Sequence, residues 1–356
     1  MRTALRWAAV VVAALSITSA VAVADRSDDP GDRSDDATTY AVIGDTPYGA
    51  AQAANFPNDV AEINADRSVR LVMHLGDIKS GSTTCDDTYF GQVRSAFDAF
   101  RVPLVYTPGD NEWTDCHRAN NGAYNPLERL ATIRKVFFPS PGRTLGRSQR
   151  VTAQAAPTVE NVRWKSEDVV FATVHVVGSN NSWLPWTGKT APTPEQAAEY
   201  QARNAANVAW LKSTFALAMR ERAKGVVIGI QADMWDAAFS GPNDQPAGYD
   251  HFTDFVRELA KNAANFGRPV LLLNGDSHQY TDDRPLADPA KPYQKAMYGI
   301  TADVPNLRRI TVNGSTTPCH EWLKLTVRPG SRAVFSVARV RFHTQPGFDP
   351  AVCPAS

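Results

Sequence analysis

Four Gly-Asp pairs stand at the ends of apolar runs typical of β-strands, and this repeated pattern constrains the fold more than any other feature. The pairs are Gly44-Asp45, Gly76-Asp77, Gly109-Asp110 and Gly275-Asp276. The C-terminal ends of parallel strands meet at one edge of a sheet, and glycine allows a sharp turn there. The four carboxylates are therefore expected to converge, together with His278, two residues after the last aspartate. Because crowded ionised carboxylates need a cation to neutralise them, the pattern predicts a metal site.

The first 24 residues have the features of a signal peptide. Arg2 and Arg6 precede an apolar stretch over residues 7–17, and Ala22-Val23-Ala24 fits the cleavage site. We expect a secreted, extracytoplasmic protein. The apolar stretch is short for a membrane span, and no later segment approaches about 18 consecutive apolar residues, so no span is expected after cleavage. An uncleaved N-terminal anchor is the alternative.

Residues 25–37 form an acidic segment that contains the sequence Asp-Arg-Ser-Asp-Asp twice and has no large apolar side chain to bury. This composition predicts a disordered linker and not a calcium loop. Residues 38–356 have a globular composition and are expected to form one domain. Removal of residues 1–24 leaves 35 basic and 37 acidic residues. This balance predicts no nucleic-acid patch, and the oligomeric state is left open.

The four cysteines form an even set, as expected for a protein in an oxidising compartment, and none has the CxxC spacing of a zinc or redox site. Of the three pairings that four cysteines allow, we expect Cys85–Cys116 and Cys319–Cys353. Cys85 follows the second Gly-Asp pair and Cys116 follows the third, so both belong to loops at the same edge of the sheet.

Apolar runs and turn residues predict an α/β architecture. Buried strands are expected over residues 39–44, 69–75, 103–107, 169–177, 226–230 and 270–274, with helices over 59–65, 89–100 and 249–264. A long helix is expected to begin after Thr193, with Ala205, Val208, Leu211, Phe215 and Met219 on its core side. Short strands close the chain over 307–312, 322–327 and 333–340. Early alternation and late strands suggest two packed sheets with helices outside.

The order of these motifs resembles the calcineurin-like metallophosphoesterases over most of the mature chain. The resemblance rests on Gly44-Asp45, Leu75-Gly76-Asp77, Gly109-Asp110-Asn111-Glu112, strand 226–230 followed by Gln231, and Gly275-Asp276-Ser277-His278. It implies a four-layer α/β/β/α sandwich and a two-metal site that hydrolyses phosphate esters. Matched by motif, Asp45 and His278 would hold one metal and Asp77 would bridge both. The second metal would face Asp110, Gln231 and Asp276.

The chain departs from the family pattern mainly at histidine positions, which are here Pro47, Asn111, Gln231 and Asp276. Asp110 replaces a family asparagine. Oxygen ligands favour hard cations over zinc, so we expect one or two Mn²⁺ or Mg²⁺ ions, with Ca²⁺ as the alternative. Two other ligand arrangements are left open: Asp233 could replace Gln231, and Asn111 could itself coordinate.

The resemblance predicts a secreted metal-dependent phosphoesterase that acts on a small-molecule phosphate mono- or diester through metal-activated water. Asp77 and Asn111 are the expected catalytic residues. Asn111 cannot supply a proton, which favours esters with good leaving groups, or a proton from His117 or from a metal-bound water. Expected substrate contacts are Lys79, Arg118, Asn180 and Asn181. The alternative is a non-catalytic secreted metal-binding module that kept the fold. Motifs of serine hydrolases, P-loop NTPases and dinucleotide-binding enzymes are absent from the sequence.

Overall fold

The computed structural model describes residues 37–236, 249–316 and 320–344. The predicted signal peptide, nearly all of the predicted linker, and both cysteines of the expected Cys319–Cys353 bridge lie outside these ranges. The described residues form two mixed sheets. Each sheet has a parallel centre, and antiparallel strands lie toward its edges.

The first sheet has six strands in the order β13-β12-β1-β2-β3-β4. In chain order its strands are β1 (Thr38–Ile43), β2 (Val69–His74), β3 (Pro103–Tyr106), β4 (Leu145–Gly146), β12 (Glu321–Val327) and β13 (Phe335–Arg341). Strands β1, β2 and β3 are parallel, so their C-terminal ends lie at the same edge.

The second sheet has seven strands in the order β10-β11-β9-β8-β7-β6-β5. They are β5 (Thr152–Ala153), β6 (Val162–Ser166), β7 (Val169–Thr173), β8 (Gly225–Gly229), β9 (Val270–Asn274), β10 (Thr281–Asp283) and β11 (Leu307–Thr311). Strands β7, β8, β9 and β11 are parallel. Both sheets therefore present a set of parallel strand ends.

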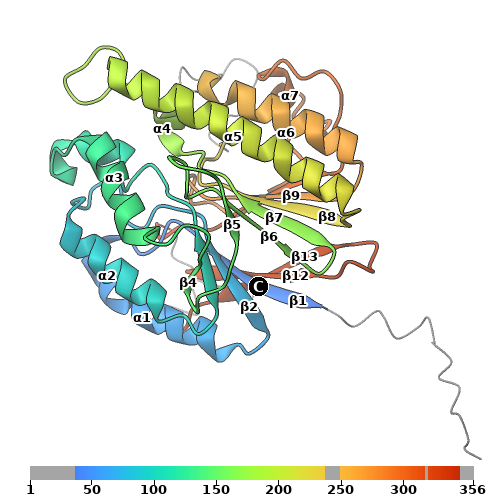
Figure 1. Cartoon of the computed structure of the whole chain (residues 1–356), viewed down its shortest axis with the longest axis horizontal. Coiled ribbons are helices and arrows are strands. Elements are labelled where there is room, and N and C mark those ends of the chain that lie inside the picture. Colours follow the sequence, from blue (N-terminus) through green and yellow to red (C-terminus); the bar gives the residue numbers. More distant parts are fainter. Residues whose placement is uncertain (1–36, 237–248, 317–319, 345–356) are drawn as a thin grey trace, which may run out of the picture. The chain divides into compact units, whose positions relative to one another are not determined.

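Helices cover the outer face of each sheet (Figure 1). Those on the first sheet are α1 (Gly49–Ala65), α2 (Asp87–Asp98) and α3 (Pro126–Phe137), and those on the second are α5 (Pro194–Arg220), α6 (Thr253–Phe266) and the short α7 (Tyr293–Ala296). One buried cluster joins the two sheets directly, for example through Tyr40 and Phe171, and two others join the helices to the outer sheet faces. The predicted α/β/β/α sandwich is confirmed.

Helix α5 begins as its capping sequence predicts, and Leu211 and Phe215 are buried as expected, but the predicted core side matches the buried face only in part. The Thr193 hydroxyl accepts a hydrogen bond from the backbone N–H of Gln196, and the Gln196 side-chain oxygen accepts one from the backbone N–H of Thr193. The predicted core stripe is wrong at Ala205 and Met219, which are exposed. The buried face consists of Arg203, Asn204, Asn207, Trp210, Leu211, Thr214, Phe215 and Ala218. Polar residues on this face donate to buried backbone carbonyls, as Asn207 does to the His175 carbonyl, so apolar periodicity alone did not identify the whole buried face.

The predicted disulfide between Cys85 and Cys116 is confirmed, with 5.9 Å between the two Cα atoms. It joins the loop after β2 to the loop after β3. Both sulfur atoms are buried beneath the helices of the first sheet. Among the described residues no helix combines the length and the apolar character that a membrane crossing requires.

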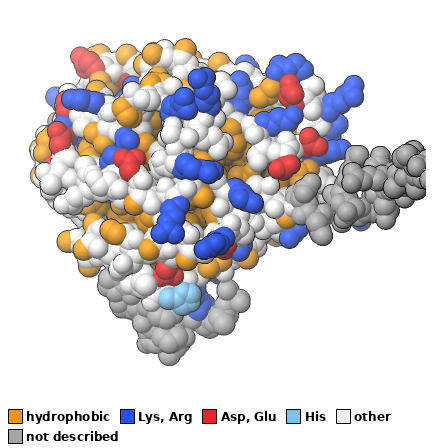
Figure 2. Space-filling model, turned by 60° about the horizontal axis from the view of Figure 1, so that its bottom comes forward, with side chains coloured by type: hydrophobic (Ala, Val, Ile, Leu, Met, Phe, Trp, Pro, Cys, Tyr) orange, Lys and Arg blue, Asp and Glu red, His pale blue; other side chains and the backbone are white. Residues whose placement is uncertain are grey.

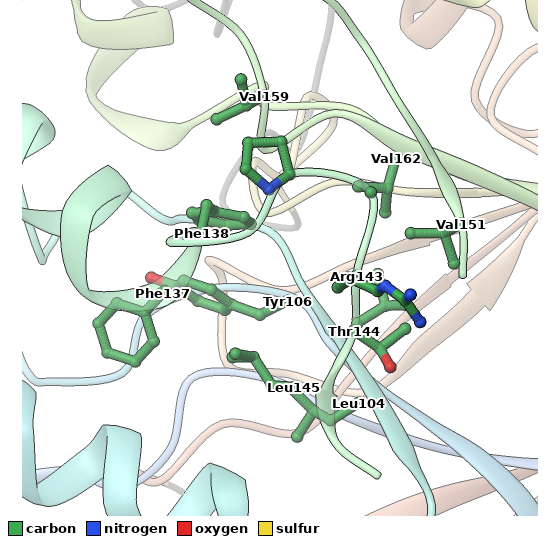
Figure 3. Close-up of a pocket in the computed structure, with 13 residues that line it drawn as sticks. Leu104, Tyr106, Phe137, Phe138, Arg143, Thr144, Leu145, Val151, Val159 and Val162 are labelled. Atoms are coloured by element: carbon green, nitrogen blue, oxygen red, sulfur yellow. The ribbon is translucent and has the colours of Figure 1, made fainter. Parts of the chain in front are cut away.

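Figure 3 shows a small pocket bounded by the end of α3, β3, β4 and β6. Phe137, Leu104, Leu145 and Val162 are among its mostly apolar lining residues, and its volume is about 10 Å³. This is room for roughly one water molecule. None of the Gly-Asp residues lines it, so it is a packing defect and not a candidate site.

His74, at the end of β2, connects the loops that follow two neighbouring strands. Its Nε2 lies 2.9 Å from the Thr46 carbonyl oxygen, to which it donates, and its Nδ1 accepts from the Gly76 N–H at 3.3 Å. The ring is fully buried, and burial lowers the pKa of His74 to about 4. The imidazole is therefore neutral and holds the loop of Asp45 against that of Asp77.

The pKa of His74 predicts a pH dependence of stability. A buried neutral histidine contributes fully above the ordinary pKa of 6.5, and the contribution is lost as pH falls from 6.5 toward 4. The full change corresponds to about 3 kcal/mol. Urea unfolding at a series of pH values should show this slope in the wild type and a reduced slope in His74→Gln, which keeps a donor for the Thr46 carbonyl. Identical slopes in both proteins would contradict the assignment.

Candidate metal centre

The Gly-Asp pairs of both sheets meet where the parallel strands end. Asp45, Asp77 and Asp110 follow β1, β2 and β3 of the first sheet, while Asp276 and His278 follow β9 of the second. Backbone hydrogen bonds connect neighbouring loops, as between the Asp45 N–H and the Gly76 carbonyl at 2.9 Å. The topology thus brings together side chains that are up to 233 residues apart.

The ligand atoms form two overlapping groups. Asp45, Asp77 and His278 make one group, and Asp77, Asp110 and Asp276 make the other; within each group all ligand atoms lie within 4.8 Å of one another. Asp77 belongs to both. Acidic and histidine side chains are thus positioned for a metal site, and the two groups share Asp77.

Glycines allow the carboxylates to approach one another. A Cβ atom on Gly109 would lie 2.0 Å from Asp77 Oδ1, and one on Gly275 would lie 2.2 Å from Asp45 Oδ2. On Gly178, after β7, a Cβ atom would lie 2.6 Å from Asp110 Oδ2 and 2.8 Å from Asp276 Oδ1. Any side chain at these positions would displace a carboxylate.

Several residues of the site have left-handed backbone conformations that cost energy outside glycine. The φ angles are 51° at Asp45, 56° at Asp77, 76° at Asp276 and 60° at His278. Such conformations persist only where the surrounding structure enforces them, and they concentrate at functional sites. The strained turns at all four positions direct these side chains into the two overlapping groups of ligand atoms.

Electrostatics show what this convergence costs. Burial, followed by the nearby charges of Asp110 and Glu112, raises the pKa of Asp77 well above its usual range. Burial and the charge of Asp110 do the same to the pKa of Asp276. Burial lowers the pKa of His278, but the hydrogen bond and charge of Asp45 outweigh it, so this pKa is raised.

The buried charge of the described residues is predominantly negative. Nine acidic side chains are buried against four basic ones. Most acids away from the site have basic partners, for example Glu160 with Arg134 and Glu321 with Arg339. In the described part of the chain, Asp77, Asp110 and Asp276 form no ion pair with lysine or arginine. In contrast to this acidic interior, the surface shown in Figure 2 has more Lys and Arg side chains than Asp and Glu side chains.

The residues present fit a bound cation. Asp45 Oδ2 is buried and has no hydrogen-bond partner among the described residues. A buried carboxylate oxygen without a donor is costly. A divalent cation between Asp45, Asp77 and His278 would satisfy this oxygen and neutralise the excess negative charge.

Gln231, after β8, reaches the site in a defined orientation. Its side-chain oxygen accepts from the Gly178 N–H at 2.7 Å. Its Nε2 therefore faces the carboxylates and donates to Asp77 at 3.2 Å and Asp110 at 3.0 Å. Gln231 lies where the motif match places a ligand, although its nitrogen faces the carboxylates here; its role as a ligand stays a prediction.

Asn111 lies beside Asp77 and donates from Nδ2 to Asp77 Oδ2 at 2.8 Å and to the Tyr48 hydroxyl at 3.1 Å. Asp233, the alternative to Gln231, is paired with Arg309 and accepts from Ser277, and its N–H supports Asp276. Asn111 and Asp233 therefore both lie next to the carboxylates. Coordination of a metal by either residue stays a prediction.

The four expected substrate contacts lie in different surroundings. Lys79 is fully buried, and its ammonium donates to the carbonyls of Ser80 and Asn111. Asn180 bonds with Asp250, and the side-chain oxygen of Asn181 accepts from Arg203. These contacts hold the loops together. Arg118 is the accessible member, with 42% of its side chain exposed and an ion pair to Asp115. The substrate roles of all four stay predictions.

His117, the proton source considered above, has a side-chain partner of its own. Its Nδ1 accepts from the Thr187 N–H at 2.9 Å. No contact between His117 and the carboxylate groups is among the hydrogen bonds of the described residues.

Sequence reasoning missed two residues that contact the carboxylates. The hydroxyl of Tyr48 lies 3.1 Å from both Asp77 Oδ2 and His278 Nε2. Ser179 donates toward Asp110 at 2.8 Å from a left-handed turn over residues 178–182, labelled α4 in Figure 1. The position of Tyr48, three residues after Asp45, was a signal for its proximity.

Comparisons with known proteins add little to this geometry. No family model matches the chain, and no curated protein matches it. Two solved structures are similar at 10% identity: GAP50, described as the anchor in the inner membrane complex of Plasmodium, and a novel phosphatase from Mycoplasma pneumoniae. The first has a TM-score of 0.43 over 88% of this chain and 92% of its own; the second has 0.39 over 86% and 93%. Likeness this weak carries no argument about activity.

Gly178 provides a test of the close packing around the carboxylates. Gly178→Ala places a methyl group against Asp110 and Asp276 and should weaken Mn²⁺ binding at least tenfold by calorimetry. Gly91→Ala, in helix α2 where no atom lies within 4 Å of the new methyl, is the matched control and should bind Mn²⁺ as the wild type does. Unchanged affinity in a folded Gly178→Ala protein would separate Asp110 and Asp276 from the metal centre.

Proposed function

We propose that this protein is a secreted metal-dependent phosphoesterase that hydrolyses phosphate mono- or diesters. The observation that carries the proposal is the pair of ligand groups sharing Asp77. Two adjacent cations, when bound, orient a phosphoryl group, activate water and stabilise negative charge on the phosphoryl oxygens. The low likeness to solved structures plays no part in the proposal.

In this proposal Asp45 and His278 hold the first cation, Asp110 and Asp276 hold the second, and Asp77 holds both. Gln231 lies beside the second position and connects Asp77 and Asp110 by donating a hydrogen bond to each. Asn111 also donates a hydrogen bond to the Asp77 carboxylate, to the same oxygen as Gln231. The glycines let all of these groups approach without intervening side chains.

The ligand chemistry favours Mn²⁺ or Mg²⁺. Four carboxylates and a single imidazole form a mostly oxygen set, which suits hard divalent cations. Ca²⁺ is the alternative occupant. The high negative charge of the centre favours full occupancy at neutral pH, because carboxylates that would otherwise hold protons exchange them for the cation.

Substrate preference follows from the residues around the carboxylates. Asn111 has no proton to transfer, so leaving groups that need little protonation should react fastest. Arg118 contributes a partly exposed guanidinium, and Gly81 lies close to both Asn111 and Arg118. We assign Arg118 to the non-reacting part of the ester.

The proposed extracytoplasmic location rests on the N-terminal sequence together with the Cys85–Cys116 disulfide. Disulfides persist in oxidising compartments and are rare in the cytosol. The disulfide links the loop after Asp77 to the loop after Asp110. It therefore also restrains the two loops that carry these carboxylates.

A panel of aryl phosphates and phosphodiesters tests the function, assayed with Mg²⁺, Mn²⁺, Ca²⁺ and Zn²⁺. We expect hydrolysis with Mn²⁺ or Mg²⁺ and a loss of at least a thousandfold in Asp77→Ala, since this variant removes the shared ligand. Asp98→Ala removes an exposed carboxylate that pairs with Arg94 on α2 and is the matched control, with expected activity equal to wild type.

The alternative is a non-catalytic metal-binding module. It would be supported if the folded, metal-loaded protein left every ester intact under all four metals. Equal metal binding by wild type and Asp77→Ala would instead remove the proposed centre itself.

A further inference from the structure

We propose that the Tyr48 hydroxyl is the group that donates a hydrogen bond to the phosphoryl oxygen of the bound ester. This inference rests on the proposed phosphoesterase function and adds a substrate-contacting residue that the motif match does not supply. The inference starts from the three hydrogen-bond donors that share one oxygen of Asp77.

The Tyr48 hydroxyl lies at the meeting point of three loops. It is 3.1 Å from Asp77 Oδ2, 3.1 Å from His278 Nε2 and 3.1 Å from Asn111 Nδ2. The ring is held edge-on to the His278 imidazole, with 5.2 Å between the ring centroids. Its backbone N–H donates to Gln52 at 2.7 Å. The phenol is thus positioned from several sides.

Donors compete for Asp77 Oδ2. Tyr48, Asn111 and Gln231 all donate to this oxygen, at 3.1, 2.8 and 3.2 Å. A carboxylate oxygen has about two lone-pair sites. A cation held by this oxygen takes one of them, which leaves room for one donor, and Asn111 makes the shortest of the three bonds.

Tyr48 is the donor left without an acceptor. Gln231 keeps its second bond, to Asp110. The other neighbours of the Tyr48 hydroxyl are His278 Nε2, which a cation would also claim, and Asn111 Nδ2, which is itself a donor. The Tyr48 hydroxyl then needs another hydrogen-bond acceptor, and a phosphoryl oxygen bound at the centre would provide one.

The other candidate donors nearby are already committed. Asn111 Nδ2 has two hydrogens, and it directs them to Asp77 and Tyr48. The Lys79 ammonium is buried against two backbone carbonyls. Tyr48 as a whole residue is less buried than these two, and its hydroxyl is the donor whose acceptor a bound cation would take away.

The test is Tyr48→Phe, which removes the hydroxyl and keeps the ring against His278. The probe is inorganic phosphate, titrated into Mn²⁺-saturated protein by calorimetry, after Mn²⁺ affinity has been measured on its own. We expect Mn²⁺ affinity within threefold of wild type and phosphate affinity about 10- to 100-fold weaker, the size of a lost hydrogen bond to a charged group. Turnover of an aryl phosphate should fall in parallel.

Tyr124→Phe is the matched control, because its hydroxyl makes no hydrogen bond among the described residues and its ring lies under Arg129. It should bind phosphate as the wild type does. Equal phosphate affinity in Tyr48→Phe and wild type overturns the inference, as does loss of Mn²⁺ binding in Tyr48→Phe, which would make the phenol a metal ligand. Wild type that binds phosphate through Tyr48 but hydrolyses no ester would refute the proposed function alone.

Discussion

The mutual repulsion of four carboxylates at the strand ends is the constraint on which the rest of this structure depends. The side chains of Asp45, Asp77, Asp110 and Asp276 converge in a region with few basic side chains to compensate their negative charge. Without structural restraint, these carboxylates would move to solvent or become protonated. The structure enforces it through left-handed turns, side-chain-free glycines and loop-to-loop hydrogen bonds. A divalent cation would turn this cost into a stabilising interaction, which is why we interpret the centre as a candidate metal site.

The supporting parts of the fold act on the loops and not on the carboxylates directly. His74 joins the loops after β1 and β2, and the Cys85–Cys116 bridge joins those after β2 and β3. The left-handed turn at residues 178–182 extends this support to the second sheet, where Gly178 touches Asp110 and Asp276. Each connection restrains two loops at once, so small displacements at the site are opposed from both sheets.

Much of the fold could be predicted from the sequence, because the four apolar runs that lead to Gly-Asp pairs are the parallel strands β1, β2, β3 and β9. The same pattern predicted which side chains converge. It could not predict Tyr48, whose contacts depend on how the Asp45 loop turns, or the orientation of Gln231, which the Gly178 N–H determines. The polar part of the buried face of α5 was also missed, because Arg203 and Asn207 donate to backbone carbonyls that only the tertiary structure brings close.

We propose that two cations bind, one on either side of Asp77, and anomalous diffraction from crystals soaked in Mn²⁺ tests this arrangement most directly. We predict two anomalous peaks, one bounded by Asp45, Asp77 and His278 and the other by Asp77, Asp110 and Asp276. Comparison of maps collected above and below the manganese edge would identify the ion. Peaks located elsewhere, or no peak among these residues at saturating Mn²⁺, would contradict the account.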